Sequence, residues 1–217
     1  MTTLKDKLTE AGLTDRIITD VDLSNLLDGT QASRYALINK ALSKREIIRL
    51  RRGLYLLAEK YRHQKLSQLF LATRIAPNSY ISMESALSYH GWIPEKVTTV
   101  TNVLAIGRTK KFTTPFGEFI FYRLPINEYE FLTGVTRVEE IKNQPFLLAC
   151  PLRALCDYVY LRKIDWQGID YLTKGLRIDM ENLMKLKSAD FDETKNVYQS
   201  KRTLRFLDNL KKELKKQ

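Results

Sequence analysis

The chain has 217 residues, of which 36 are lysine or arginine and 25 are aspartate or glutamate, so its formal net charge is +11. Two cysteines, Cys150 and Cys156, are too few for a disulfide framework, and the most apolar stretch, PFLLACPLRALC, is too short and too interrupted to span a bilayer. We therefore expect a soluble, cytoplasmic protein whose charge favours a polyanionic partner.

The first helical pattern follows residue 20. Asp20 is placed to cap a short helix, because Val21, Leu23 and Leu26 recur after it at helical spacing. Residues 28–30, Asp-Gly-Thr, then predict a turn.

A second amphipathic helix is predicted over residues 33–46, SRYALINKALSKRE. Its apolar side chains fall on one face at 100° per residue, and the opposite face is small, polar or cationic. Nothing bulky on that opposite face would prevent it from entering a groove. The apolar face consists of Leu37, Ile38, Ala41 and Leu42, and the other face of Ser33, Ala36, Asn39, Lys40 and Ser43.

The hydrophobic period changes from helix to strand after residue 46. Residues 47–50 and 54–57 read as two short strands, and Arg51-Arg52-Gly53 forms the predicted turn between them. Gly53 would supply the backbone angles that such a turn requires. Arginine suits the tip of a ribbon that meets DNA, because it stays charged and pairs with phosphate in a fork geometry.

Helix, turn, helix and two-stranded ribbon is the order of a winged helix-turn-helix. The sequence therefore predicts an α+β chain with a winged helix-turn-helix DNA-binding domain over residues 1–60 and a larger mixed α/β domain over residues 61–217. Asn39 could read an adenine edge, whereas Arg34 and Lys40 would hold phosphates. The predicted DNA-binding residues are Ser33, Arg34, Tyr35, Asn39, Lys40, Arg49, Arg51 and Arg52.

The larger domain begins with a helical pattern over residues 61–75 and a second helix after Ser82 that stops at Gly91. Residues 97–124 are rich in strand formers, and another strand is expected near residues 144–149. Pro151 opens the next helix, which is predicted to reach residue 161. Helices over residues 174–187 and 201–215 complete the chain, the last of them in a strongly basic tail.

No sequence feature indicates catalysis. Nucleotide-binding and nucleophile motifs are missing from the sequence, and His63 and His90 have no partners at metal-ligand spacing. We interpret His90 as a helix-terminal residue stacked on Trp92, and we expect no enzyme activity, metal or cofactor. A nuclease carried to DNA remains an alternative, with Glu140 and the acidic run at residues 190–193 as its candidate ligands.

Three stretches together resemble the AbiEi family, the antitoxins of AbiE-type (type IV) toxin–antitoxin systems. They are ALSKREIIRLRRGLYLL, YISMESALSYHGWIP and ACPLRALCDYVYL. The resemblance implies a protein that represses its own operon through promoter inverted repeats and counters a nucleotidyltransferase toxin, in many cases without a stable complex. A third alternative is an interaction module whose C-terminal domain binds the toxin directly.

One position departs from the family's pattern. Relatives tend to have a glycine between the second helix and the first strand of the ribbon, where this chain has Lys44-Arg45-Glu46. The sequence therefore does not determine the residue at which that helix ends.

Overall fold

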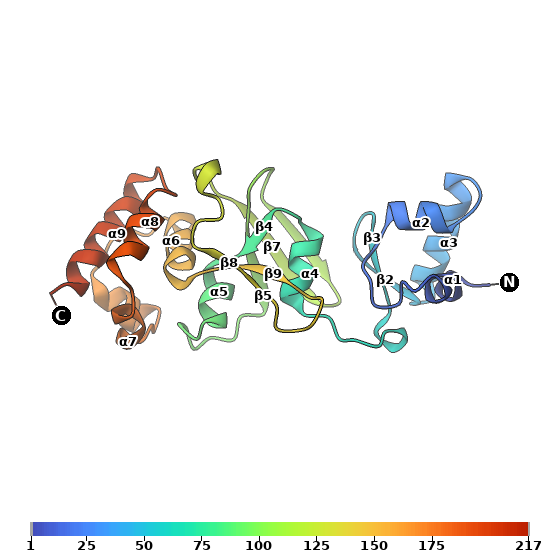
Figure 1. The fold of residues 1–217 in the computed structure, drawn as a ribbon, viewed down its shortest axis with the longest axis horizontal. Coiled ribbons are helices and arrows are strands. Elements are labelled where there is room, and N and C mark those ends of the chain that lie inside the picture. The colour runs from blue at the N-terminus through green and yellow to red at the C-terminus, as the bar shows by residue number, and fades with distance from the viewer. Residues whose placement is uncertain (1, 217) are drawn as a thin grey trace. The chain divides into compact units, whose positions relative to one another are not determined.

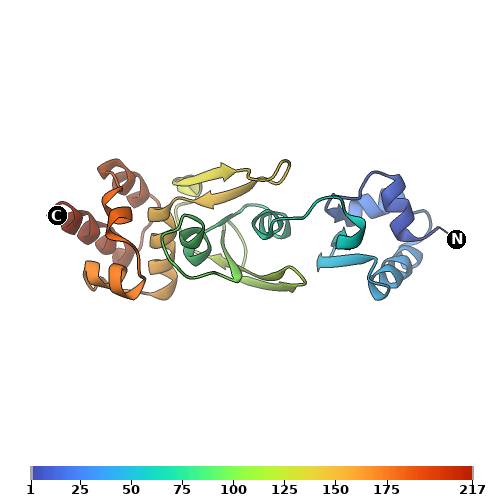
Figure 2. The same cartoon turned by 90° about the horizontal axis from the view of Figure 1, so that it is seen from below.

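The computed structural model describes residues 2–216. Its contacts divide the chain into two compact units. The first unit comprises residues 1–67 together with 112–116, and the second comprises residues 68–111 and 117–217. The predicted domain boundary, after residue 60, falls before the end of the first unit. Figures 1 and 2 show the elements of each unit from two directions.

The first unit contains three helices and a small antiparallel sheet (Figure 1). Its helices are α1 (Leu4–Glu10), α2 (Asp20–Leu26) and α3 (Gln31–Ser43), and its strands are β1 (Ile18–Thr19), β2 (Ile47–Arg51) and β3 (Leu54–Leu57). The strands are ordered β1-β3-β2, with β3 antiparallel to both neighbours. A short 3-10 helix, η1 (Glu59–Tyr61), follows β3. The sequence did not predict α1 or β1.

Two of these helices begin with the same capping arrangement. Thr19 caps α2, because its hydroxyl accepts a hydrogen bond from the amide of Asp22 and the Asp22 carboxylate accepts one from the amide of Thr19. Thr3 and Asp6 repeat this pattern at α1. The expectation that Asp20 is the cap was therefore wrong. Asp20 is the first helical residue, since Thr19 has the extended backbone that a cap requires.

The core of the first unit lies between the helices and one face of the sheet. Ile38 and Ala41 bring the inner face of α3 to it, as predicted, but Leu37 is 37% exposed. Leu37 lines a surface hollow that it shares with Thr3, Leu4 and Lys40. The other members of the core are Leu4, Leu8, Ile18, Leu23, Leu27, Ile47, Tyr55 and Leu57.

The second unit is built on a six-stranded mixed sheet with the order β6-β7-β5-β4-β9-β8. Strand β4 is antiparallel to β5 and parallel to β9, β5 is parallel to β7, and β8 is antiparallel to β9. The expected strand near residues 144–149 is β9, whereas β8 was not predicted. The strands are β4 (Ser79–Ile81), β5 (Thr99–Leu104), β6 (Lys110–Thr114), β7 (Gly117–Arg123), β8 (Val135–Val138) and β9 (Phe146–Ala149).

Helices pack around this sheet and around one another. Helix α4 (Gln68–Ile75) contacts β4, β5 and β9, and α5 (Met83–Tyr89) contacts β5 and α6 (Pro151–Arg162). Helix α6 also contacts α8 (Ser188–Lys195) and α9 (Lys201–Leu214). Together with the first unit this arrangement confirms the α+β class. The remaining helical segments are the 3-10 helix η2 (Glu128–Glu130), the π-helical turn η3 (Tyr171–Gly175) and α7 (Met180–Met184).

Two predicted helices of the second unit were wrong in extent. The helix expected over residues 61–75 begins only at Gln68, because the segment before it forms η1 and a connection. The helix expected over residues 174–187 is divided into η3 and α7, with Arg177 in the left-handed backbone region between them. An arginine at positive φ interrupts a helix that its apolar spacing would otherwise continue.

A charged pair is completely buried in the second unit. Arg153 and Asp157, one turn apart on α6, have no exposed side-chain surface. Asp157 accepts hydrogen bonds from the hydroxyls of Tyr80, Ser82 and Tyr198, at 2.9, 2.7 and 2.6 Å. Burial acts to lower the pKa of Arg153, but the carboxylate of Asp157 and the phenol groups of Tyr198 and Tyr80 together outweigh it, so the net pKa is raised. The guanidinium therefore stays charged inside the fold.

Arg153 also holds a loop at the surface of the second unit. Its guanidinium donates to the carbonyl of Thr133 at 2.7 Å and to the hydroxyl of Tyr80. The ring of Phe131 meets the ring of Tyr80 edge to face, with centroids 5.0 Å apart. The buried side chains of Arg153 and Tyr80 therefore fix the loop formed by residues 128–134.

Within residues 2–216, no helix combines the length and apolar character needed to cross a membrane.

Candidate nucleic-acid interface

Helix α3 carries five of the eight predicted contact residues. Thr30 caps the helix through the amide of Ser33, and Ile38 and Ala41 anchor its inner face in the core. Ser33, Asn39 and Lys40 are consequently exposed on the outer side. Small or flexible side chains occupy this outer side, as groove entry requires.

Two of the predicted contacts on α3 already make local hydrogen bonds. The hydroxyl of Ser33 donates to the carbonyl of Thr30 at 2.8 Å, and the guanidinium of Arg34 donates to the carbonyl of Ser24 at 3.3 Å. Arg34 thereby ties α3 to the end of α2 while most of its donors remain available. Tyr35, another predicted contact residue, is 54% exposed.

Lys40 lies beside a second lysine at the junction of α1 and α3. Lys40 and Lys44 line a surface hollow whose other residues include Thr3 and Leu37. Asn39 points about 100° away from Lys40 around the helix axis. The two lysines therefore border the hollow shared with the start of α1, and Asn39 does not line it.

The turn between β2 and β3 consists of Arg52 and Gly53. Strand β2 extends through Arg51, one residue further than predicted, and Gly53 has the expected positive φ of 74°. Strand β1 pairs with β3 up to Leu54, next to the turn, so the ribbon projects little beyond the sheet. The side chain of Arg52 is exposed, and Arg51 donates to the carbonyl of Arg52 at 3.1 Å.

An acidic residue lies against this turn that sequence reasoning did not connect with it. The amide of Asp20 donates to the carbonyl of Gly53, and a methyl group placed on Gly53 would lie 2.6 Å from an Asp20 carboxylate oxygen. Only the pairing of β1 with β3 brings these residues together. The negative charge beside the turn opposes phosphate binding there.

Arg49 lies on the same face of the sheet as the helices. It is paired directly opposite Tyr55, a core residue, and its guanidinium lies 5.8 Å from the centroid of that ring. Cross-strand partners share a face, so Arg49 rests on the edge of the core while remaining exposed. The three arginines thus differ in setting. Arg49 is stacked on Tyr55, Arg51 is hydrogen-bonded to the carbonyl of Arg52, and Arg52 is exposed at the tip of the turn.

The candidate nuclease residues have structural partners. Glu140 accepts a hydrogen bond from the hydroxyl of Tyr89, Asp190 accepts one from the amide of Lys187 at the start of α8, and Asp192 pairs with Lys211. Among residues 2–216, no group of three or more histidine, cysteine or carboxylate side chains is arranged to hold a metal ion.

His90 was expected to stack on Trp92. Its ring instead meets Tyr89 edge to face at 5.4 Å, and its Nε2 lies 2.9 Å from the carbonyl oxygen of Ala149. Helix α5 ends at His90. In the turn that follows, the amide of Trp92 donates a hydrogen bond to the carbonyl of Leu87 in the helix. His90 therefore joins α5 to the end of β9.

Seven of the eight predicted residues lie on α3 and β2, which pack against each other, and the eighth, Arg52, lies in the turn that follows β2. The arrangement combines an exposed helix face, an arginine at a tight turn and one opposing carboxylate. No protein-family model matches the chain, and no curated protein is significantly similar to it.

Proposed function

We propose that the chain is a DNA-binding antitoxin that represses its own operon. The observation that carries this proposal is the topology of the first unit. The elements follow one another in the order α1, β1, α2, α3, β2 and β3. The three strands form a sheet of order β1-β3-β2. This order supports the assignment of a winged helix-turn-helix, with α3 proposed as the recognition helix and the turn at Arg52 as the wing.

The exposed face of α3 supports a role in the major groove. Asn39 has the side chain that pairs with both hydrogen-bonding positions of adenine, and Lys40 supplies a charge for phosphate. Arg49, Arg51 and Arg52 extend the cationic surface along β2. An isolated helix of this kind occurs on many surfaces, whereas its combination with an arginine-bearing wing favours duplex DNA.

The antitoxin part of the proposal rests on the resemblance of three sequence stretches to AbiEi antitoxins. Two of those stretches meet in the second unit, because α5 carries SALSYH, α6 carries PLRALCDYVYL, and these helices pack together. The motifs therefore build one region of the fold. We infer from this that the second unit counters the co-encoded nucleotidyltransferase toxin.

Binding to the chain's own promoter tests the repressor function. The full chain should shift a labelled duplex taken from immediately upstream of its gene, and should shift a shuffled duplex of equal composition only at higher protein concentration. Absence of any shift at low ionic strength would contradict the proposal.

The antitoxin function requires a separate test in cells. Expression of the chain should restore growth to cells that express the neighbouring nucleotidyltransferase gene, and a variant lacking DNA binding should still restore it. Continued growth arrest with the full chain, at verified protein levels, would leave only the repressor function.

A further inference from the structure

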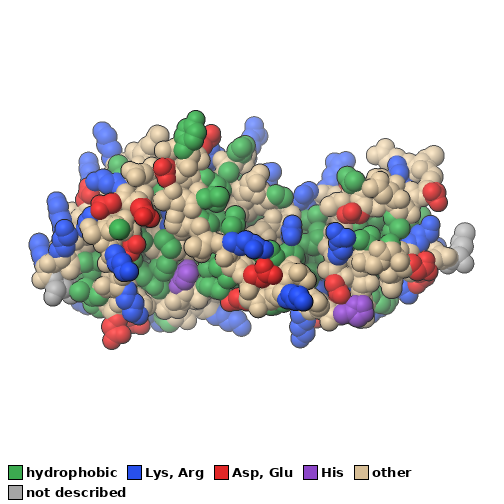
Figure 3. Space-filling model, viewed as in Figure 1, with side chains coloured by type: hydrophobic (Ala, Val, Ile, Leu, Met, Phe, Trp, Pro, Cys, Tyr) green, Lys and Arg blue, Asp and Glu red, His purple; other side chains and the backbone are tan. Residues whose placement is uncertain are grey.

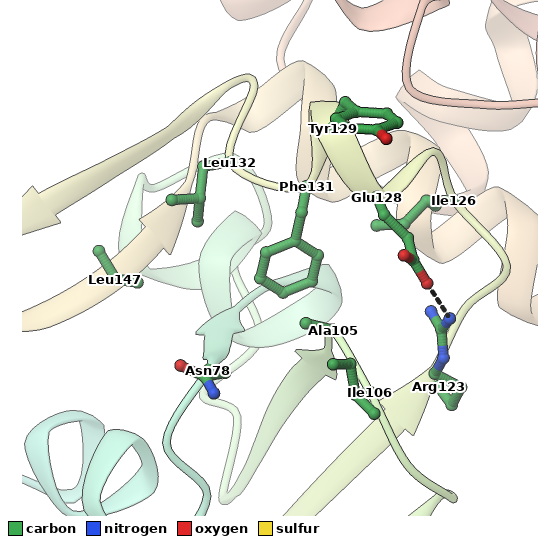
Figure 4. A pocket seen from close by; sticks show the side chains of 10 residues that line it. All are labelled: Asn78, Ala105, Ile106, Arg123, Ile126, Glu128, Tyr129, Phe131, Leu132 and Leu147. Carbon is green, nitrogen blue, oxygen red and sulfur yellow. Dashed lines mark ion pairs between the residues drawn. The ribbon is translucent and has the colours of Figure 1, made fainter.

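The second unit contains an open apolar pocket that the proposed function does not use. The pocket has a volume of about 450 Å³ and lies where β5 and β7 end and β4 begins. Figure 4 shows Phe131, Leu132 and Leu147 around the same hollow as Asn78, with the Arg123–Glu128 ion pair at one side. The nitrogen and oxygen atoms of that pair are 3.8 Å apart.

Large hydrophobic side chains at the rim of this pocket are exposed to solvent. Tyr129 is 98% exposed, Ile106 is 77% exposed and Leu132 is 53% exposed. Hydrophobic side chains also stand out from the surface at η2 in Figure 3. A small molecule inside the pocket would leave these rim residues in water, whereas the surface of a protein partner would cover them.

The part of the rim that lies on the 128–134 loop is held by the buried charged pair. Leu132 and Phe131 belong to the loop that Arg153 fixes through the carbonyl of Thr133. Burying a guanidinium is costly unless all of its donors are engaged, so the loop's conformation is strongly determined. A preformed apolar rim binds a partner with little loss of conformational entropy.

The charge around the pocket indicates the kind of partner. A second hollow shares Asn78 and Leu147 with the pocket, and we call the two neighbouring hollows the groove. Its charged lining residues are Arg74, Arg123, Arg137 and Glu128; Arg123 pairs with Glu128, and Arg137 pairs with Glu139, which is not part of the lining. Arg74 lies over the ring of Phe70 and pairs with no carboxylate in the described part of the chain.

We propose that this groove binds an acidic segment of a partner protein that carries bulky apolar side chains. One apolar side chain of the segment fills the pocket beside Phe131 and is covered by Tyr129 and Leu132. Its carboxylates meet Arg74 at one end of the groove and compete with Glu128 for Arg123 at the other.

Fluorescence anisotropy with defined peptides tests this proposal. The probe is a labelled synthetic peptide in which glutamates alternate with leucines, and the control peptide has lysines in place of the glutamates. The full chain should bind the acidic peptide, and Leu132→Glu and Arg74→Glu should each weaken binding by about tenfold or more. Met184→Glu introduces the same charge at a residue that is 48% exposed and outside the groove, and it should leave binding unchanged.

Several outcomes would overturn the proposal. These are equal binding of the lysine peptide, no binding of either peptide, or acidic-peptide binding that Leu132→Glu and Arg74→Glu do not weaken. Displacement of the acidic peptide by oligothymidylate would assign the groove to single-stranded nucleic acid. A dimer in light scattering that Leu132→Glu dissociates would assign it to a second copy of the chain. DNA binding by the first unit is measured separately and does not depend on these results.

Discussion

Arg45 shows how one residue can determine the end of a helix. The amide of Glu46 donates to the carbonyl of Ala41 and the amide of Arg45 donates to the carbonyl of Leu42, which is the Schellman arrangement at a helix terminus. This arrangement places Arg45 at φ 53°, in the left-handed region. Glycine is favoured there because it has no Cβ. Arg45 is thus a point of backbone strain.

Arg45→Gly should stabilise the first unit by about 1 kcal/mol, because it removes the steric cost of positive φ. Both tryptophans, Trp92 and Trp166, belong to the second unit, so the measurement is hydrogen exchange of the amides of β3, read by mass spectrometry. Arg45→Ala removes the same charge without relieving the strain and should not slow exchange. Equal slowing by both variants would contradict the argument.

The buried pair of Arg153 and Asp157 is a residue-scale feature whose disruption should destabilise the second unit. Asp157→Asn should destabilise the second unit by roughly 3–5 kcal/mol, since the guanidinium would stay buried without its counter-charge. Urea unfolding followed by tryptophan fluorescence measures this loss. Tyr198→Phe, which removes one hydrogen bond to the same carboxylate, should cost only about 1–2 kcal/mol. Similar losses in both variants would mean that the hydrogen bonds, not the charge, dominate.

At the scale of elements, α1 and α2 depend on identical caps that respond to pH. Hydrogen bonds from the hydroxyl and amide of Thr19 lower the pKa of Asp22, and Lys5 and Thr3 lower the pKa of Asp6. Because the folded state depresses these pKa values, the stabilisation is complete above about pH 4 and is lost as the pH falls through the folded values. Both helices should therefore weaken together in acid.

Replacing Thr3 and Thr19 by alanine tests these caps. At pH 7 each replacement should cost about 1 kcal/mol, and the double variant should lose less further stability on acidification than the unaltered chain. Hydrogen exchange of α1 and α2 measures both effects. Thr9→Ala is the control, because its hydroxyl bonds within α1 to the carbonyl of Lys5 and caps nothing. An unchanged acid response would place the pH-sensitive groups elsewhere.

Helix α3 and the ribbon should contribute differently to DNA binding. Asn39→Ala should cost roughly 1–3 kcal/mol at particular base pairs and little at others, because a bidentate amide contact reads base identity. Affinities for a panel of single-base operator variants give this pattern. Ser43→Ala, on the same exposed side of the helix, is the matched control. A uniform loss across the panel would mean that Asn39 contacts phosphate instead.

At the scale of the whole molecule, the net charge of +11 is unevenly distributed. Between residues 31 and 53 seven side chains are basic, and only Glu46 is acidic. In the basic tail, by contrast, Arg202 pairs with Asp165, Lys195 with Asp208 and Lys211 with Asp192. Part of the C-terminal charge is therefore balanced within the fold, whereas Asp20 is an acidic residue that lies against the turn between β2 and β3.

The salt dependence of DNA binding measures this distribution. Each phosphate contact contributes about 0.9 to the slope of log affinity against log salt, so Arg51→Ala with Arg52→Ala should flatten the slope by about two. Asp20→Asn should act in the opposite direction and tighten binding to all sequences, because it removes the carboxylate beside the turn. An unchanged slope in the arginine double variant would exclude the turn from the interface.

The sequence by itself determined the local elements, because their signals are local. The period of apolar residues located α3, Pro151 marked the start of α6, and a glycine after arginines located the turn between β2 and β3. The sequence did not predict α1, β1 or β8. Helix α1 and strand β1 have few residues each, and β8 carries exposed polar side chains at an edge of the sheet. Such segments depend on their neighbours for stability.

Tertiary structure alone decided which distant residues meet. Strand pairing places Asp20 beside Gly53, and packing of α6 against the sheet and α9 encloses Arg153 and Asp157 with Tyr80 and Tyr198. The apolar pocket of the second unit likewise combines residues from four separate stretches of the chain. Sequence periodicity reports which face of an element is apolar, but the partner of that face is selected by the packing of the whole unit.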